Sequence, residues 1–231
     1  MATKFSFKDF TFKKFLRKSI ELVFWAHIVL ITIVGLLSIY MIWFNPPAGT
    51  LIMYRAEFNF SNVKKPSALK MEEIPAIFIH DLLNAEDGRF REHYGFDIEA
   101  IQRARELNEK AGYKAYGAST ISQQLARTLF LIPNKTYFRK YVELIIAIEM
   151  DLILSKDRIL ELYLTYAELG DKVYGVQDAS QYYYKRNFSK ISADQRIRLL
   201  VILASPIKYG PYNFNSNRLL KKRYKNIRRW H

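Results

Sequence analysis

The 231-residue sequence contains no cysteine and only four histidines. The missing cysteines exclude a disulfide scaffold, a cysteine nucleophile and any cysteine-ligated zinc or iron–sulfur site. The scattered histidines do not suggest a histidine-rich metal site. The chain also lacks a Gly-x-x-x-x-Gly-Lys phosphate loop, a Gly-x-Ser-x-Gly elbow and an Asp-x-Asp pair for a metal-bound nucleotide sugar. Half of the residues are hydrophobic, so the chain is able to bury a core.

Positive charge is concentrated at the two ends of the chain. Residues 1–21 carry six Lys or Arg against two acidic residues, and residues 218–231 carry seven with no acidic residue. Basic ends of this kind are typical of proteins that bind nucleic acid or an anionic membrane surface. Charge alone does not choose between these two classes.

A long apolar stretch favours the membrane. Residues 22–44 contain His27 and Tyr40 as their only ionisable groups. As a helix the stretch spans about 35 Å, which is enough to cross the hydrocarbon core of a bilayer. We therefore expect a cytoplasmic basic tail at 1–21, a transmembrane helix at 22–44 and one domain at 45–231. Six Lys or Arg precede the stretch, whereas only Arg55 and Lys64 fall in the twenty residues after it, which places the domain outside the cytoplasm.

Helical periodicity dominates the rest of the chain. Apolar residues recur at helical spacing in 76–83, 121–131, 136–154, 156–164 and 197–204. Thr120-x-x-Gln123 and Ser192-x-x-Gln195 are capping boxes that predict helix starts. Strand-like alternation is scarce, so we expect a mainly α domain. The apolar face predicted for 136–154 consists of Tyr141, Leu144, Ile145, Ile148 and Leu152.

Two polar segments are candidates for chemistry, and both have a plainer explanation. Glu86 and Asp87 end the first helix of the domain, where a carboxylate can transfer protons or simply be solvated. The segment Gly117–Gln124 opens the next helix with a glycine turn and hydroxyl groups. Such a helix start can bind an anion, and Arg127 one turn later would strengthen it, but a capping box alone also explains the pattern.

A third polar segment has Arg139, Lys140 and Glu143 within one helical turn. This spacing fits either a surface ion pair or a cationic clamp for a phosphorylated group, oriented by Glu143. Lys156 adds a positive charge at the start of the following helix, where a cation opposes the helix dipole. That arrangement is a reason to expect an anionic ligand.

Together these segments resemble the family 51 glycosyltransferases, the peptidoglycan polymerases, between about Glu73 and Pro211. The wording of the second motif and the short chain are most similar to the monofunctional biosynthetic peptidoglycan transglycosylases. Two residues depart from the family pattern, because Thr165 replaces a common Asn and Asp178 replaces a small residue. The matching segments are Glu86-Asp87-x-x-Phe90-x-x-His93-x-Gly95-x-Asp97, Gly117–Gln124, Arg139-Lys140-x-x-Glu143, Lys156-x-x-Ile159-Leu160-Glu161-x-Tyr163-Leu164 and Tyr174-Gly175-Val176-x-x-Ala179-x-x-Tyr182-Tyr183.

The resemblance implies a lysozyme-like all-α glycosyltransferase domain behind a single transmembrane helix. Its implied reaction polymerises lipid II into β-1,4-linked glycan strands by one inverting displacement, with release of polyprenyl pyrophosphate. Glu86 would be the general base and Glu143 the second catalytic residue. The implied substrate-binding residues are Asp87, Phe90, His93, Ser119, Gln123, Gln124, Arg127, Arg139, Lys140 and Lys156.

The resemblance also implies the surroundings of the reaction. No cofactor is obligatory and no metal site is predicted, although a divalent cation such as Mg²⁺ or Mn²⁺ is compatible with the residues. The expected partners are lipid II, the growing lipid-linked glycan, membrane lipid and other cell-wall synthesis or division proteins, with no nucleic acid. The expected location is the bacterial inner membrane, with the catalytic domain on the periplasmic side.

Three alternative functions are less consistent with the residues. A glycan hydrolase of lysozyme-like fold also uses a glutamate acid, but it has no anionic leaving group that needs a cationic clamp. A non-catalytic membrane scaffold has no need for the Glu86, Glu143 and clamp pattern. A nucleic-acid binder would use the basic C-terminal tail, which is expected to lie outside the cytoplasm.

Overall fold

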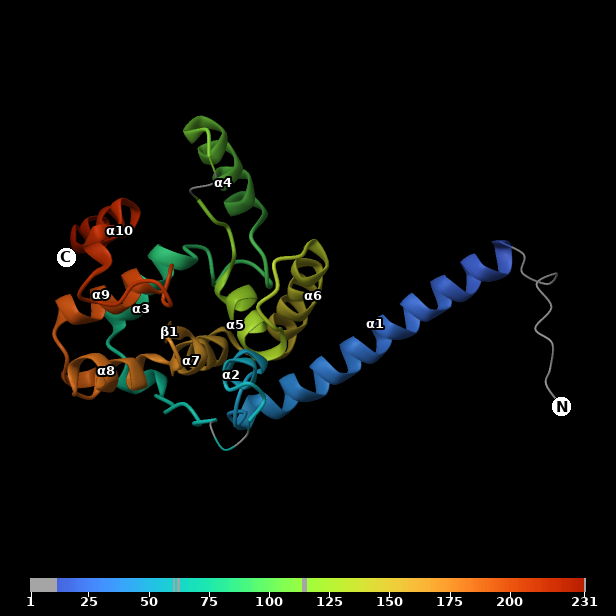
Figure 1. Cartoon of the computed structure of the whole chain (residues 1–231), viewed down its shortest axis with the longest axis horizontal. Coiled ribbons are helices and arrows are strands. Elements are labelled where there is room, and N and C mark those ends of the chain that lie inside the picture. Colours follow the sequence, from blue (N-terminus) through green and yellow to red (C-terminus); the bar gives the residue numbers. More distant parts are fainter. Residues whose placement is uncertain (1–11, 60, 62, 114–115, 231) are drawn as a thin grey trace.

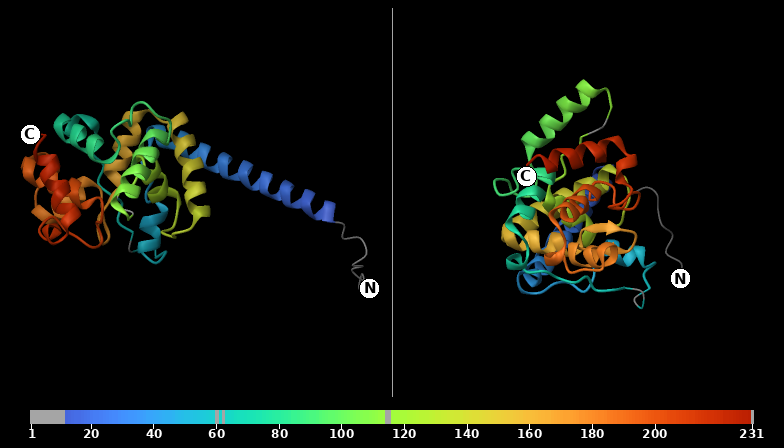
Figure 2. Two further views of the ribbon diagram at one scale, coloured as in Figure 1. Left: turned by 90° about the horizontal axis from the view of Figure 1, so that it is seen from above. Right: turned by 90° about the vertical axis from the view of Figure 1, so that its left-hand side faces the viewer.

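The computed structural model describes residues 12–230 except 60, 62, 114 and 115. One long helix, α1 (Phe12–Trp43), projects from a helical body formed by the described residues that follow it (Figure 1). The view from above in Figure 2 shows the same separation. The predicted mainly α fold is confirmed. The helices of the body are α2 (Thr50–Arg55), α3 (Ala76–Glu86), α4 (Ile98–Ala111), α5 (Ile121–Phe130), α6 (Tyr137–Ile153), α7 (Lys156–Tyr166), α8 (Val176–Tyr184), α9 (Ala193–Ile202) and α10 (Arg218–Arg228).

Helix α1 is long and apolar enough to cross a membrane, with a most apolar window of mean hydropathy 2.5 that is 11% buried. It begins at Phe12, so residues 12–21 of the predicted tail are already helical. The remainder of that tail, residues 1–11, lies outside the described residues. The helix ends at Trp43, one residue before the predicted end of the span, and Pro46 and Pro47 follow it. The helix fits the role of a membrane anchor.

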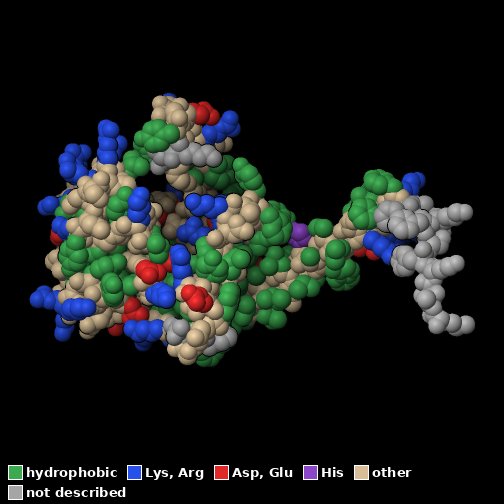
Figure 3. Space-filling model, in the orientation of Figure 1, with side chains coloured by type: hydrophobic (Ala, Val, Ile, Leu, Met, Phe, Trp, Pro, Cys, Tyr) green, Lys and Arg blue, Asp and Glu red, His purple; other side chains and the backbone are tan. Residues whose placement is uncertain are grey.

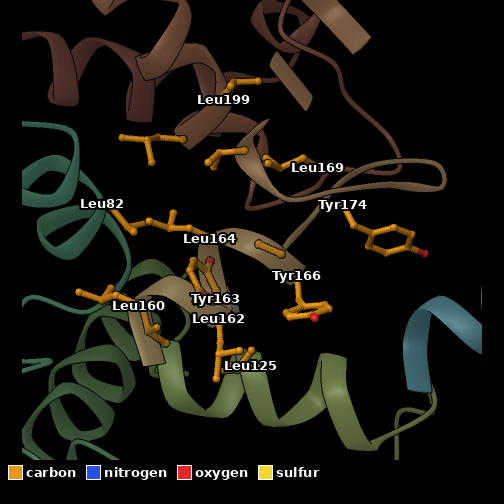
Figure 4. Close-up of a cluster of buried hydrophobic side chains, with 14 of the residues drawn as sticks. Leu82, Leu125, Leu160, Leu162, Tyr163, Leu164, Tyr166, Leu169, Tyr174 and Leu199 are labelled. Carbon is orange, nitrogen blue, oxygen red and sulfur yellow. The ribbon is translucent and has the colours of Figure 1, made fainter. Parts of the chain in front are cut away.

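Helix α5 is the centre of the body, because it packs against α2, α6 and α7. Its predicted apolar side, Ile121, Leu125 and Leu129, is buried. Figure 4 shows how side chains from α3, α5, α7 and α9 meet in this core. Those drawn there include Leu82, Leu125, Leu160, Leu162, Tyr163, Leu164 and Leu199, all of them nearly inaccessible to solvent.

The face of α6 that the sequence suggested does not face the core. Tyr141 and Leu152 are 47% and 69% exposed. The core side of α6 instead carries Ile146, Ala147 and Met150 together with Glu143. The sequence pattern misled because α6 has a second apolar contact: it packs along α1, where the Tyr141 hydroxyl is 2.8 Å from Nε2 of His27.

Polar caps fix the helix starts around the site. The predicted capping boxes at Thr120 and Ser192 are both present, with the Thr120 hydroxyl accepting from the Gln123 amide and Ser192 from Gln195. Thr136 and Ser155 cap α6 and α7 in the same way. These caps satisfy amide groups that a helix start leaves without partners.

One small sheet interrupts the helices. Strands β1 (Glu168–Gly170) and β2 (Val173–Tyr174) pair antiparallel, with Glu168 opposite Tyr174. Strands of three and two residues are too short to produce a recognisable alternation in sequence, which is why the hairpin was not predicted. It leads into α8, and the chain then returns through α9 to α10, which packs on α9.

Candidate active site

Glu86 is the last residue of α3, and its side chain is 11% exposed. Both carboxylate oxygens have partners. Gln124 of α5 donates its amide to Oε2 at 2.8 Å, and the Arg223 guanidinium of α10 donates to Oε1. The Tyr163 hydroxyl in turn donates to the Gln124 side-chain oxygen at 3.0 Å. Burial raises the pKa of Tyr163, which keeps this donor protonated. Glu86 is therefore held in one orientation from two sides.

The neighbouring Asp87 ties the end of α3 to the start of α5. Its carboxylate accepts the backbone N–H of Ile121 at 3.0 Å and contacts Nε2 of His93 at 2.9 Å. Gly95 completes this connection: its φ is +80°, and its carbonyl accepts from the Thr120 hydroxyl at 2.7 Å. The loop after α3 thus fixes the position of the residue that precedes it, Glu86.

Glu143 lies buried on α6 between two cations. Its side chain is 1% exposed, and its two oxygens separately contact Arg139 and Lys140. The Lys140 ammonium also donates to the hydroxyl of Ser119 at 3.1 Å and to the side-chain oxygen of Gln123 at 3.2 Å. The spacing of Arg139 and Glu143 also allowed a surface ion pair, and that interpretation is wrong because Glu143 is buried. Through Lys140, this buried glutamate joins α6 to the glycine-rich segment before α5.

A cavity of about 310 Å³ opens beside Gln124 and Tyr163, and we call it the cationic cavity. Of the described residues, Glu168 is the only acidic one in its lining, and its carboxylate is 3.1 Å from Arg55. Burial raises the pKa of Glu168, and the neighbouring Arg55 opposes that shift. Two of the cations that line the cavity, Arg127 and Lys135, form no ion pair among the described residues. The cations that line the cavity are Arg55, Arg127, Lys135 and Arg139.

Two further cavities lie near Glu86, which lines the smaller one. A small one of about 110 Å³ lies against Glu86, Asp87 and Ser119. A larger one of about 660 Å³, the α10 cavity, is lined by Arg223 and Lys222 together with apolar Leu219 and Trp230. Both cavities contact Asn84 and Ala85, which immediately precede Glu86. In Figure 3 a hollow opens beneath the α4 region, with Lys and Arg side chains along its edge.

Comparisons with known proteins agree with this geometry. The family model described as Transglycosylase matches residues 54–230. The chain belongs to this transglycosylase family. It is 38% identical over 208 residues to the "Biosynthetic peptidoglycan transglycosylase" of Acinetobacter baylyi, covering 86% of this chain and 92% of that protein. It is 37% identical over 199 residues to the protein of the same name in Aromatoleum aromaticum, covering 78% and 85%.

The family assignment makes the chain a glycosyltransferase enzyme, as the motifs predicted. The transglycosylase residues predicted from sequence fall into two groups. Glu86, Ser119, Gln124, Arg127 and Arg139 line cavities or contact a residue that does. The roles assigned to these side chains in substrate binding and catalysis stay predictions.

The second group lies beneath the cavities. Phe90 is fully buried, and the Lys156 ammonium lies 4.5 Å from the centre of its ring. Lys156 also contacts the buried carboxylate of Asp151 at 2.6 Å and the His93 carbonyl at 2.6 Å. An ammonium held in this way supports the loop after α3, and it does not line any of the three cavities around Glu86.

The sequence analysis did not select three residues that the structure brings to the candidate site. Arg223 is one of seven basic residues in the last 14 positions, and nothing in that composition singles it out. Arg55 and Lys135 are isolated cations outside the matched motifs. Their importance depends on where the folded chain places them, in the walls of cavities next to Glu86.

Proposed function

We propose that this chain polymerises lipid II into β-1,4-linked glycan strands and releases polyprenyl pyrophosphate. The observation that carries the proposal is a glutamate whose two partners, Gln124 and Arg223, line a cavity rich in cations and a second, partly apolar cavity. A base is needed for the attacking hydroxyl, and positive charge is needed for the departing pyrophosphate. The names of the relatives in Acinetobacter baylyi and Aromatoleum aromaticum support peptidoglycan as the product.

In the proposed reaction, Glu86 accepts the proton of the 4-hydroxyl on the incoming lipid II. The hydroxyl oxygen forms a bond to the anomeric carbon of the growing lipid-linked glycan, and the bond from that carbon to the pyrophosphate oxygen breaks. A single displacement inverts the anomeric centre. The two electrons of the broken bond leave with the polyprenyl pyrophosphate.

The cationic cavity is the proposed site of the departing pyrophosphate. Arg127 and Lys135 are suited to this role because neither forms an ion pair among the described residues, although Glu168 acts on Arg127 at longer range. Arg139 also lines the cavity, but it shares its charge with buried Glu143. Fixed cations of this kind stabilise the charge that develops on the leaving group without any need to reorganise solvent.

The α10 cavity is the proposed site of the incoming lipid II. It lies next to Glu86 through Arg223, and its volume of about 660 Å³ falls within the usual range for a ligand pocket. Lys222 offers a positive charge for a second pyrophosphate, and Leu219 and Trp230 offer apolar surface beside it. The two lipid-linked substrates would thus approach Glu86 from different cavities.

Positioning of Glu86 explains the buried residues of the motifs. Gln124 and Arg223 each contact one carboxylate oxygen, so the substrate hydroxyl must share an oxygen with one of them. Asp87 and His93 hold the loop that ends α3 against α5. Glu143 is proposed to act by fixing Arg139 and Lys140.

No obligatory metal enters this proposal. Glu143, the carboxylate best placed to attract Mg²⁺ or Mn²⁺, has both oxygens engaged by cations, so a divalent ion would have to displace one of them. We expect polymer yield to persist when divalent ions are removed with a chelator. Complete loss of polymer, restored by Mg²⁺ or Mn²⁺, would contradict this expectation.

We propose that α1 anchors the chain in the bacterial inner membrane, with the body on the periplasmic side. The basic residues before the apolar stretch support this orientation. Anchoring confines enzyme and lipid-linked substrate to one surface and raises their effective concentration. Because the chain has no cysteine, a single cysteine introduced at Thr3 or at exposed Glu92 reports which side of the membrane that position faces. In intact cells, an impermeant maleimide should label the Glu92 position and leave the Thr3 position unlabelled. An impermeant maleimide that labels only the Thr3 position would reverse the orientation.

The deciding experiment measures polymerisation of labelled lipid II by the detergent-solubilised full-length chain. Glu86→Gln keeps the size of the side chain and removes the base, so we expect the rate to fall at least about 10²-fold. The variant should stay folded and should bind lipid II as the wild type does. Near-full polymer yield from Glu86→Gln would overturn the assignment of the base, and no polymer from the wild type would overturn the proposed function.

A further inference from the structure

A fourth cavity lies against the β1–β2 hairpin, which also lines the cationic cavity. It measures about 290 Å³ and is bordered by the segment before α3, by the hairpin and by α8. We call it the lysine pocket, because three lysines line it against one acidic residue, Asp178. The three are Lys64, Lys172 and Lys185.

The lysines of this pocket are open to solvent, although the Lys185 ammonium donates to the Tyr182 carbonyl at 3.1 Å. Among the described residues, no ion pair involves any of the three ammonium groups, and all three residues are exposed. Lys172 and Lys185 both have a φ of 56°, a left-handed conformation that glycine adopts more easily. Lysine at two such positions places positive charge beside the pocket at some cost in backbone strain.

Asp178 builds one wall of the pocket. Its Oδ2 accepts the backbone N–H of Ser67 at 3.3 Å and so holds the segment before α3 against α8. This residue departs from the family pattern, in which a small side chain is common. The departure therefore helps to form the pocket and does not touch the cavities around Glu86.

Tyr182, one helical turn after Asp178 on α8, also lines the pocket. The ring of Tyr182 is exposed and packs edge-on against Tyr183 with centroids 4.9 Å apart, while the Tyr183 hydroxyl donates to the Leu169 carbonyl at 3.0 Å. Tyr182 thus has a fixed backing and offers a flat apolar face beside the ammonium of Lys185, which lies 5.7 Å from the ring centre. Such a wall suits a ligand that is both peptide-like and anionic.

The hairpin connects this pocket to the cationic cavity. Glu168 of β1 lines the cationic cavity, and its cross-strand partner Tyr174 of β2 lines the lysine pocket. Cross-strand partners are only about 5 Å apart, so neighbouring residues of one hairpin line both spaces. In the proposed reaction, a growing glycan strand whose reducing end is held in the cationic cavity would pass along this hairpin. Its next disaccharide units would then lie near the lysine pocket.

We propose that the lysine pocket binds the acidic stem peptide of the growing glycan strand and so delays release of the strand. This proposal rests on the proposed function, since the strand is the product of that reaction. Carboxylates of the peptide would meet the three lysines, and the peptide chain would lie against Tyr182. Slower release allows more additions before the strand departs, so the pocket sets product length and leaves the chemical step unchanged.

The test compares product lengths from the full-length wild type and the variant Lys64→Gln/Lys172→Gln/Lys185→Gln. The substrate is lipid II with its complete stem peptide. Conditions are chosen so that each glycan strand binds the enzyme only once, and the strands are then separated by length on a gel. Loss of three exposed charge contacts weakens retention by about tenfold, so we expect markedly shorter strands at a similar initial rate. A matched control, Lys190→Gln/Lys208→Gln/Lys225→Gln, removes the same charge outside the pocket and should keep the wild-type lengths.

A second substrate identifies what the lysines bind. With a lipid-linked disaccharide that lacks the peptide, wild type and variant should give strands of equal length. A length difference that persists on this substrate would assign the lysines to sugar or lipid and overturn the peptide assignment. Equal lengths on complete lipid II would overturn the pocket proposal alone, whereas no polymer from the wild type would overturn the proposed function and this proposal with it.

Discussion

The carboxylate of Glu86 contacts the guanidinium of Arg223, which lies 137 positions further along the chain. Arg223 also donates to the carbonyl of Ala85 at 3.3 Å and to that of Leu200 at 3.2 Å. One side chain of α10 therefore joins the end of α3 to α9. The basic C-terminal helix is part of the candidate site, which its charge alone did not indicate.

Arg223→Gln should lower kcat more than it raises KM, because Arg223 positions Glu86 and also lines the α10 cavity. The variant removes the contact that fixes one oxygen of Glu86, and misplacement of a catalytic group costs about tenfold to a hundredfold in rate. Initial rates of lipid II polymerisation over a range of substrate concentrations measure both constants. Arg223→Lys keeps the charge and should recover part of kcat.

The control for this prediction is Lys221→Gln, an exposed neighbour on α10 that lines none of the cavities around Glu86. It should behave as wild type. An unchanged kcat in Arg223→Gln, with the protein still folded, would show that Arg223 does not position Glu86.

The sequence identified those parts of the site that are local. Thr120 and Gln123 form a capping box within one turn, and Arg139 and Glu143 face the same side of α6, so spacing alone predicted both. The burial of Glu143 was not predictable, because it depends on which side of α6 meets α5. Helix α1 covers the other side, and the apolar pattern of α6 did not distinguish the two partners.

Residues that meet across the fold could not be predicted from spacing. Arg223 reaches Glu86 only because α10 folds back on α9, and Arg55 enters the cationic cavity through its pair with Glu168, 113 positions away. Each is one cation among the 36 Lys and Arg of the chain. Selecting them requires the tertiary arrangement of the helices.

Gly95→Ala should destabilise the protein by about 2–4 kcal/mol. The φ of Gly95 is +80°, and an added Cβ would lie 2.6 Å from the backbone nitrogen of Ile148 on α6. Backbone cannot move aside as a flexible side chain can. Thermal unfolding of the detergent-solubilised chain measures the loss.

Gly88 gives a matched comparison in the same loop. A Cβ there would meet nothing within 4 Å, so Gly88→Ala should shift stability by no more than about 0.5 kcal/mol. Equal effects of the two substitutions would contradict the close contact between Gly95 and α6.

Glu143→Gln should destabilise the protein by about 3–5 kcal/mol, because it leaves Arg139 and Lys140 without their shared buried carboxylate. Denaturant unfolding compares it with Glu92→Gln, which breaks an ion pair whose glutamate side chain is 63% exposed. The exposed pair should contribute less than about 1 kcal/mol. Glu143→Gln with wild-type stability would mean that the two cations find other partners.

The stability contributed by Asp194 should disappear in acid. Burial alone would raise the pKa of this carboxyl, but hydrogen bonds from Tyr224 and Arg198 outweigh burial and hold the pKa below its ordinary value of 3.8. A lowered folded-state pKa stabilises the fold above the unfolded-state value, and the gain is lost as the pH falls through the folded-state value. Wild type should therefore exceed Asp194→Asn in denaturant midpoint by a constant amount from about pH 7 to about pH 5, with the difference shrinking below about pH 4. Tyr224→Phe removes one of the two hydrogen bonds, so wild type should exceed this variant in denaturant midpoint by a smaller amount of the same sign. A difference between wild type and Asp194→Asn that does not depend on pH would show that the ionised carboxylate does not hold α9 to α10.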